Sequence, residues 1–144
     1  MLNIIKVSNK EDLKKCLDIR EKVFIEEKKV PIEIENDCYD IITEACDHFL
    51  IKYENKTVGT LRCYVKEKDE VKLQRFCILK EYRKLGIGKE VLAYIENYYK
   101  NYKKVIKMDA KYEALVFYEK CGYKKISEVF IEANIEHIAM IKYI

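Results

Sequence analysis

Glycine is scarce in this sequence, yet two of its four glycines, Gly86 and Gly88, lie within three positions. They stand between a strand-like apolar segment and the start of a helical apolar pattern. Glycine has no Cβ, so a ligand can approach its backbone closely. The first N–H groups of a helix are unpaired and carry partial positive charge. Because Arg83, Lys84 and Lys89 add cationic charge, the stretch predicts a cradle for a pyrophosphate.

Two familiar phosphate-binding loops do not match this stretch. A P-loop requires Gly-x4-Gly-Lys-Ser/Thr, but Arg83 and Glu90 stand where the first Gly and the Ser/Thr are needed. A dinucleotide-binding loop requires Gly-x-Gly-x-x-Gly, and Val91 occupies its third glycine position. What remains is the pattern Arg83-x-x-Gly86-x-Gly88, after a strand and before a helix.

The rest of the sequence predicts an α/β layered domain with a mixed sheet. The absence of a linker or repeat favours a single domain over residues 1–144. Helices are expected from a capping box at Ser8 and Glu11 to about Phe24, over about 86–102, and over 112–123, ended by Gly122. The acidic segment 32–47 is only partly helical in pattern. Strands are expected at 2–7, 48–54, 57–68, 71–79, 104–110, about 124–130 and 137–143.

Composition excludes several classes of protein. The 144 residues carry a net charge of only +3, with acids interleaved among the lysines, which argues against a nucleic-acid binder. No apolar run is long enough to span a membrane and no signal peptide is evident, so a cytoplasmic location is expected. The spacing of cysteines and histidines suggests no metal site. The six cysteines are expected to be mostly buried free thiols: Cys16, Cys38, Cys46, Cys63, Cys77 and Cys121.

Two motifs resemble those of the GNAT superfamily, the acetyl-CoA-dependent N-acyltransferases. "RFCILKEYRKLGIGKEVL" (75–92) is similar to motif A, whose pattern is Arg/Gln-x-x-Gly-x-Gly/Ala. "ALVFYEKCGY" (114–123) resembles motif B, with Cys121 and Tyr123 in place of the usual Leu and Phe. The order of predicted elements agrees as well, so the resemblance covers nearly the whole chain.

Three further features resemble the ElaA-like branch of that superfamily. They are "VFIEEKKVPIEIENDCYD" (23–40), a histidine at the next strand (His48), and the closing "EVFIEANIEHIAMIK" (128–142). Lys28 departs from this pattern, because Gln is usual at that position. The resemblance implies a GNAT fold, with a mostly antiparallel sheet of about six to seven strands and about four helices.

The resemblance also implies where acetyl-CoA binds as co-substrate. The backbone of the strand before the loop would pair with the pantetheine arm, and a strand N–H from Cys77 or Ile78 would stabilise the oxyanion. The loop amides would hold the pyrophosphate. The implied cofactor-binding residues are Cys77, Ile78, Leu79, Arg83, Lys84, Leu85, Gly86, Ile87, Gly88 and Lys89.

Tyr118 matches the tyrosine that often acts as general acid in the superfamily. A donor near sulfur eases the departure of the thiolate. Its alternative role is that of a core residue of the short helix, and Phe117 is interpreted as core. A nucleophilic cysteine lacks a local signature, which favours direct attack of an amine on acetyl-CoA.

The acceptor site and the general base are less defined by the sequence. The acidic segment could bind a cationic amine or form a solvated helix face, and Arg75 could face the acceptor or pair with an acid. Both histidines could instead be structural. The candidate acceptor-site residues are Glu27, Glu35, Asp37, His48, Arg75 and His137.

The expected function is transfer of an acetyl group to an amine in a ternary complex. The acceptor would be a small-molecule amine, such as a polyamine or an aminated metabolite, or a lysine side chain. Neither nucleic acid nor a membrane is an expected partner, and no metal is expected. A homodimer is one of the assemblies that the sequence allows. Two alternatives remain at this point: an enzyme that uses a longer acyl-CoA, and a CoA-binding regulatory domain without catalysis.

Overall fold

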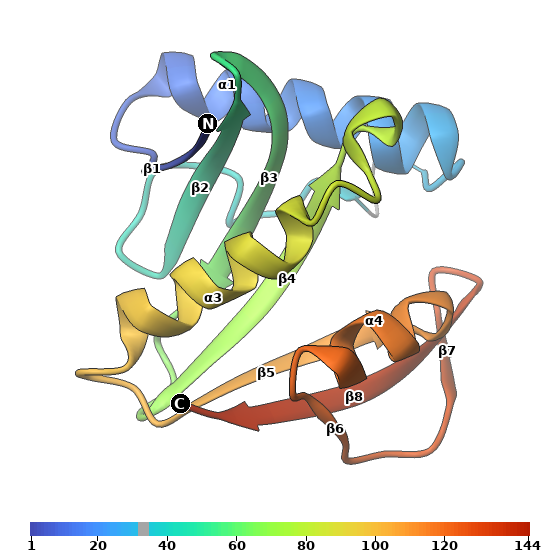
Figure 1. Cartoon of the computed structure of the whole chain (residues 1–144). Coiled ribbons are helices and arrows are strands. Elements are labelled where there is room, and N and C mark those ends of the chain that lie inside the picture. The colour runs from blue at the N-terminus through green and yellow to red at the C-terminus, as the bar shows by residue number, and fades with distance from the viewer. Residues whose placement is uncertain (32–34) are drawn as a thin grey trace.

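A mixed sheet of eight strands forms the centre of the protein (Figure 1). The computed structural model describes residues 1–31 and 35–144, so part of the expected acidic segment, 32–34, lies outside the described residues. The strand order is β1-β2-β3-β4-β5-β8-β6, with β7 paired to β8. Only β4 and β5 pair in parallel. The strands are β1 (Leu2–Lys6), β2 (Cys46–Tyr53), β3 (Lys56–Tyr64), β4 (Glu70–Ile78), β5 (Val105–Lys111), β6 (Lys124–Lys125), β7 (Phe130–Glu132) and β8 (Ile135–Tyr143).

Helices cover both faces of this sheet. α1 (Lys10–Arg20) continues into a π-helical segment, η1 (Glu21–Glu27), and lies behind the sheet in Figure 1. α3 (Ile87–Tyr99) and α4 (Leu115–Lys120) lie in front of it. The described residues thus hold three α-helices, and the expected α/β class with a mostly antiparallel sheet is confirmed. None of these described helices is long and apolar enough to cross a membrane.

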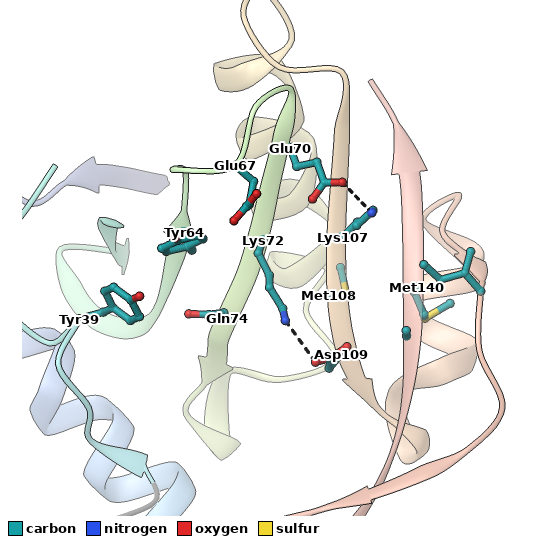
Figure 2. A pocket seen from close by; sticks show the side chains of 12 residues that line it. Tyr39, Tyr64, Glu67, Glu70, Lys72, Gln74, Lys107, Met108, Asp109 and Met140 are labelled. Atoms are coloured by element: carbon teal, nitrogen blue, oxygen red, sulfur yellow. Dashed lines mark ion pairs between the residues drawn. The ribbon is translucent and has the colours of Figure 1, made fainter. Parts of the chain in front are cut away.

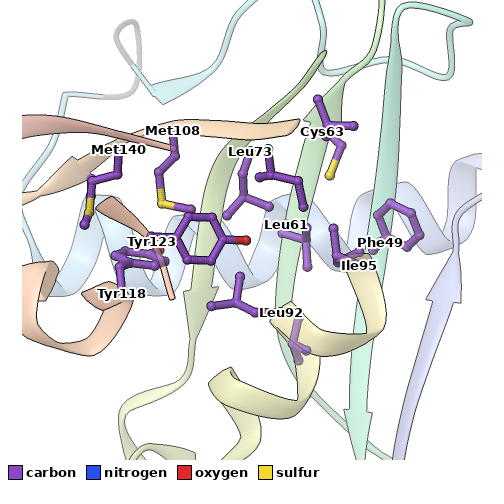
Figure 3. Packing of buried hydrophobic residues seen from close by; sticks show 14 of the residues in the cluster. Phe49, Leu61, Cys63, Leu73, Leu92, Ile95, Met108, Tyr118, Tyr123 and Met140 are labelled. Carbon is purple, nitrogen blue, oxygen red and sulfur yellow. The ribbon is translucent and has the colours of Figure 1, made fainter. Parts of the chain in front are cut away.

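Alternation along β2 distributes its side chains between the two layers. Phe49 and Ile51 enter a large apolar cluster with α3, whereas Leu50 packs with Leu13 and Cys16 of α1. All five side chains are buried. The large cluster extends under α4, where Tyr118 and Tyr123 join Met108 and Met140 (Figure 3).

The first helix begins one residue later than the sequence predicted. Asn9, not Ser8, is the N-cap, and its Oδ1 accepts a hydrogen bond from the backbone N–H of Asp12 at 2.8 Å. The predicted Ser8–Glu11 capping box is therefore wrong, because the Asn9 side chain already serves that end of the helix. The helix also continues past Phe24, through η1 to Glu27.

The end of the chain differs most from its prediction. The segment predicted as a strand at 124–130 contains only the two-residue β6 and the start of β7. β8 begins at Ile135, two residues earlier than expected, and forms a hairpin with β7. Ala133 and Asn134 both have positive φ, 51° and 63°, which is the backbone of a two-residue hairpin turn. Ala is uncommon at such a position, so the turn was not recognisable in the sequence.

The two parallel strands separate from each other partway along their length. Register pairs join β4 and β5 from Glu70↔Val105 to Leu73↔Met108 only, although β4 continues to Ile78. The separation begins next to a β-bulge, where the register of β3 against β4 shifts between Thr60 and Arg62. Arg75 lies in this bulge with φ 53°. A bulge bends its strand, so β4 is directed away from β5 at this point.

Candidate functional site

The gap between the separated strands opens into a cleft of about 1100 Å³. It extends from the start of α3, past the ends of β4 and β5, to α4 and the β7–β8 hairpin. Nearly all of the predicted cofactor loop lines it. Leu79 and Leu85 are not lining residues: the Leu79 backbone N–H donates to the Val58 carbonyl at 2.8 Å, and the Leu85 side chain is exposed.

The two glycines that open α3 serve different needs. Gly86 has φ 81°, a left-handed conformation that disfavours a side chain, although beyond its own neighbours in the chain no atom lies within 4 Å of where its Cβ would be. A Cβ on Gly88 would lie 2.9 Å from the Phe117 ring. The Phe117 side chain is 37% exposed and lines the cleft, so its interpretation as a core residue is wrong.

Arg83 fixes the loop to the rest of the protein through its side chain. Both terminal nitrogens donate to the Glu27 carboxylate at 2.7 Å, and its Nε donates to the Ile78 carbonyl at 2.8 Å. These hydrogen bonds lower the pKa of Glu27 to about 2. Glu27, a candidate for acceptor binding, does not line the cleft and is committed to Arg83.

Tyr118 lies where the core meets the cleft. Its ring is buried, packs against Tyr123 at a centroid distance of 5.9 Å, and lines the cleft. Burial raises the pKa of this phenol, so it stays protonated at neutral pH. No other residue of the described chain makes a hydrogen bond to its hydroxyl, which leaves the O–H available to a ligand.

The acidic segment contributes to a network of buried ion pairs. Arg20, only 2% exposed, donates through Nε to Glu35 at 2.5 Å and through Nη1 to Asp40 at 2.5 Å. Its Nη2 also reaches the Glu35 backbone carbonyl at 2.9 Å. A buried guanidinium with this many acceptors is well compensated.

Two further arginines complete this network. Arg62 donates to Asp37 at 2.6 and 2.7 Å and to Asp40 at 2.8 Å. Arg75 lies 3.2 Å from the Glu35 carboxylate and 3.5 Å from that of Asp37. Three arginines therefore balance three carboxylates. Arg75 pairs with acids and also lines the cleft, so the contacts exclude neither of its two expected roles. All three carboxylates are engaged by arginines.

The two histidines have different surroundings. The ring of His48 is buried on β2, and its Nε2 contacts the Tyr39 carbonyl at 2.8 Å, away from the cleft. Burial lowers its pKa. His137 on β8 does line the cleft and stacks on Phe130. Its Nδ1 contacts the Ile135 carbonyl at 2.8 Å. A carbonyl can only accept, so in the neutral ring Nδ1 carries the hydrogen and Nε2 has the lone pair.

The cysteines are unpaired throughout the described residues. Cys77 lines the cleft, but burial raises the pKa of its thiol to about 12, which makes it a poor nucleophile. Cys16, Cys46 and Cys63 are buried as expected, whereas Cys38 is exposed and Cys121 half-buried. In the described part of the chain, no three His, Cys, Asp or Glu side chains are grouped as metal ligands.

Lys111 also lines the cleft, although it was not among the predicted site residues. It ends β5, one residue beyond the predicted strand, and its Nζ lies 4.8 Å from the centre of the Phe24 ring. Burial lowers its pKa. The alternation of side chains along β5 could have identified it. Ile106, Met108 and Ala110 pack on the α3 side of the sheet, so Lys111 lies on the opposite face.

A second, smaller cavity of about 460 Å³ adjoins the cleft on that other face (Figure 2). Lys72, Gln74, Met108 and Asp109 line both cavities. Lys72 pairs with Asp109 at 3.5 Å, and the pair lies along β4 and β5 in Figure 2. The smaller cavity therefore extends the cleft along this face of the sheet.

Comparison with known proteins agrees with this geometry. Residues 22–144 match the family model described as an acetyltransferase (GNAT) domain. The uncharacterized protein YyaT of Bacillus subtilis is 39% identical over 144 residues, covering 99% of this chain and 97% of the relative.

Solved structures share the fold. Escherichia coli ElaA superposes with a TM-score of 0.86 at 19% identity, covering 99% of both chains. An aminoglycoside 6'-N-acetyltransferase complexed with coenzyme A gives a TM-score of 0.79 at 16% identity, covering 98% of this chain and 96% of that one. The separated strands, the glycine loop and the family match lead to one conclusion: this chain belongs to the GNAT acetyltransferase family.

Proposed function

We propose that the protein transfers an acetyl group from acetyl-CoA to an amine by direct attack in a ternary complex. The observation that carries this proposal is the separation of β4 from β5 directly beside the start of α3. Family membership supports acyl transfer from coenzyme A in general. We propose in addition that the acyl group is acetyl, that the acceptor is an amine and that the amine attacks the thioester directly.

The loop before α3 is suited to the phosphates of acetyl-CoA. The first turn of α3 is closed by a hydrogen bond from the backbone N–H of Glu90 to the Gly86 carbonyl at 3.3 Å. The amides of Ile87, Gly88 and Lys89 therefore precede the first hydrogen-bonded turn and are available to an anion. The side chain of Arg83 is engaged by Glu27, so it would shape the loop, and the amides would bind the phosphates.

Tyr118 is the proposed general acid. In the reaction the amine nitrogen attacks the thioester carbon, the carbon–sulfur bond breaks, and the departing sulfur takes the hydroxyl proton of Tyr118. Solvent then returns a proton to the tyrosinate. The phenol is protonated before the reaction and has no competing hydrogen bond within the described residues. A strand N–H at Cys77 or Ile78 is the proposed oxyanion donor.

His137 is the proposed general base. Among the acidic and histidine residues of the acceptor-site candidates, Glu27, Glu35, Asp37, His48 and His137, only Glu35 and His137 line the cleft. Arg20 and Arg75 engage Glu35, whereas the Nε2 lone pair of His137 has no partner in the described structure. Nε2 would take the proton that the attacking amine loses.

Amine-dependent release of the CoA thiol tests this proposal. Tyr118→Phe should keep acetyl-CoA binding and lower kcat by roughly 10²–10⁴-fold, and His137→Gln should do the same for the base. Tyr112→Phe is the matched control, because Tyr112 is exposed and does not line the cleft. Unchanged kcat in Tyr118→Phe would refute its role. Turnover only with longer acyl-CoA, or binding without any turnover, would instead support one of the two alternatives.

A further inference from the structure

The cleft is lined by more cationic than anionic side chains. Seven lysine and arginine side chains line it, against four carboxylates. Four of these cations have a carboxylate partner, the longest separation being the 3.6 Å between Lys28 and Glu113. Within the described chain, the three cations without a carboxylate partner are Lys84, Lys89 and Lys111.

Two of these unpaired cations are explained by the proposed cofactor. Lys84 and Lys89 belong to the loop at the start of α3, where the phosphates of acetyl-CoA would bind. Lys111 lies elsewhere. Its neighbour Ala110 packs in the cluster under α3, so alternation turns Lys111 to the opposite face of the sheet. There its Nζ contacts the ring of Phe24, which packs with Cys77.

Lys111 also lies directly opposite the proposed general base. In the register of β5 and β8 it pairs with His137, and cross-strand partners project side by side on one face. Any amine placed for deprotonation by His137 would therefore have the Lys111 ammonium close to it. A half-buried ammonium without a counter-ion is unfavourable, and a bound anion would relieve that cost.

The carboxylates of the cleft do not favour a polycationic acceptor. Glu35 is engaged by Arg20 and Arg75, and Asp109 pairs with Lys72 at 3.5 Å. Glu132, on the exposed hairpin, is the one lining carboxylate that lacks an ion-pair partner among the described residues. Glu113 and Glu35 also interact electrostatically with Lys111, but Glu113 is paired with Lys28, and Glu35 with Arg20 and Arg75. The net charge of the cleft lining is thus positive.

We propose that the acceptor is a small amine that also carries a carboxylate, such as an amino acid, and that Lys111 binds this carboxylate. The inference rests on the proposed acetyltransferase function and names the substrate class of the same site. The carboxylate would orient the acceptor so that its amino nitrogen lies toward His137 and the gap between β4 and β5. The bonds that form and break are those of the acetyl transfer proposed above.

Matched acceptors provide the test. The panel consists of L-amino acids, the corresponding amino amides and the corresponding decarboxylated amines, assayed at saturating acetyl-CoA. Wild type should favour the carboxylates in kcat/KM by about 10- to 100-fold, as expected for a hydrogen bond between charged groups. Lys111→Met should remove this preference through the acceptor KM, and Lys111→Arg should largely retain it.

Lys89→Met is the control for the other end of the cleft. It should raise the KM for acetyl-CoA and leave the acceptor preference intact, whereas Lys111→Met should leave the KM for acetyl-CoA intact. Equal or better turnover of the amides or amines by wild type would overturn the inference. A Lys111→Met variant that loses kcat equally for every acceptor would also overturn it.

A binding measurement separates this inference from the proposed function. With coenzyme A bound, L-amino acids should raise the melting temperature of wild type but not that of Lys111→Met, even if no acceptor in the panel is turned over. No such rise, in a protein that does bind acetyl-CoA, would contradict the substrate class alone. Failure to bind acetyl-CoA at all would overturn the proposed function together with the inference.

Discussion

The role of a side chain in the loop before α3 cannot be inferred from its charge alone. Arg83 looks like a phosphate ligand in the sequence, yet its guanidinium bridges Glu27 and the Ile78 carbonyl. The loop thereby gains a fixed attachment to η1. Residues 27 and 83 are far apart in sequence, so their pairing could not be deduced without the fold.

The pair between Glu27 and Arg83 predicts a specific dependence of stability on pH. The folded-state pKa of Glu27 is about 2, lowered chiefly by its hydrogen bonds to Arg83, whereas an unfolded glutamate titrates near ~4.3. Its contribution to stability is therefore present above about pH 4.3 and is lost as the pH falls toward about 2. Chemical denaturation of wild type and Glu27→Gln across this range measures it.

The two proteins should become more alike in stability as the pH falls from about 5 to about 2, because protonation removes the charge that Glu27→Gln already lacks. Glu26→Gln is the matched control, since Glu26 is exposed and neighbours Glu27 in the chain. A constant stability difference between wild type and Glu27→Gln over this pH range would argue against the ion pair.

At the scale of elements, local patterns and long-range contacts explain which predictions succeeded. The strand–loop–helix unit around Gly86 was predictable because glycines and apolar periodicity are local signals. The π-helical η1 was missed because it continues α1 without a break. The bounds of the β7–β8 hairpin were missed because Ala133 is uncommon at a positive-φ turn position. Lys111 was missed because the predicted strand stopped at Ala110.

The arginine network was also beyond local reasoning. Arg20 and Arg62 reach acids that lie 15 to 25 positions away in the chain. The sequence showed an acidic segment, but not that arginines on α1 and β3 would neutralise it. An anionic acceptor pocket was therefore a reasonable hypothesis that the contacts do not support.

Removing one arginine from this network should destabilise the fold strongly. Arg20→Met leaves Glu35 and Asp40, both with side chains under 8% exposed, short of a counter-charge. Breaking a buried pair in this way costs about 3–5 kcal/mol, which corresponds to a fall in melting temperature of roughly 6–20 °C. Thermal unfolding followed by circular dichroism measures the change.

An exposed ion pair on the same helix gives the comparison. Lys14 lies 3.1 Å from Asp18 in an exposed i,i+4 pair, and Lys14→Met should change stability by less than ~0.5 kcal/mol. Similar melting temperatures for Arg20→Met and Lys14→Met would mean that the buried network does not support the fold.

In the molecule as a whole, the sheet separates at one place, between β4 and β5. β1 to β4 form one antiparallel block and β5 to β8 another, joined by only four register pairs between β4 and β5. α3 covers the first block and α4 the second, as Figure 1 shows. The proposed phosphate-binding loop, general acid, general base and acceptor-binding lysine therefore lie on different elements that meet at the gap.

Acetyl-CoA binding at this gap should raise the melting temperature of the protein. A ligand at 100 times its Kd stabilises the native state by about 2.7 kcal/mol, or roughly 5–10 °C for a protein of this size. Wild type should show such a shift, and Gly86→Glu should not, because it adds bulk and negative charge beside the loop amides. Gly122→Glu, at the other positive-φ glycine, tests the effect of strain alone and should retain the shift. No shift in wild type at millimolar acetyl-CoA, or an equal shift in Gly86→Glu, would contradict the assignment of this cleft.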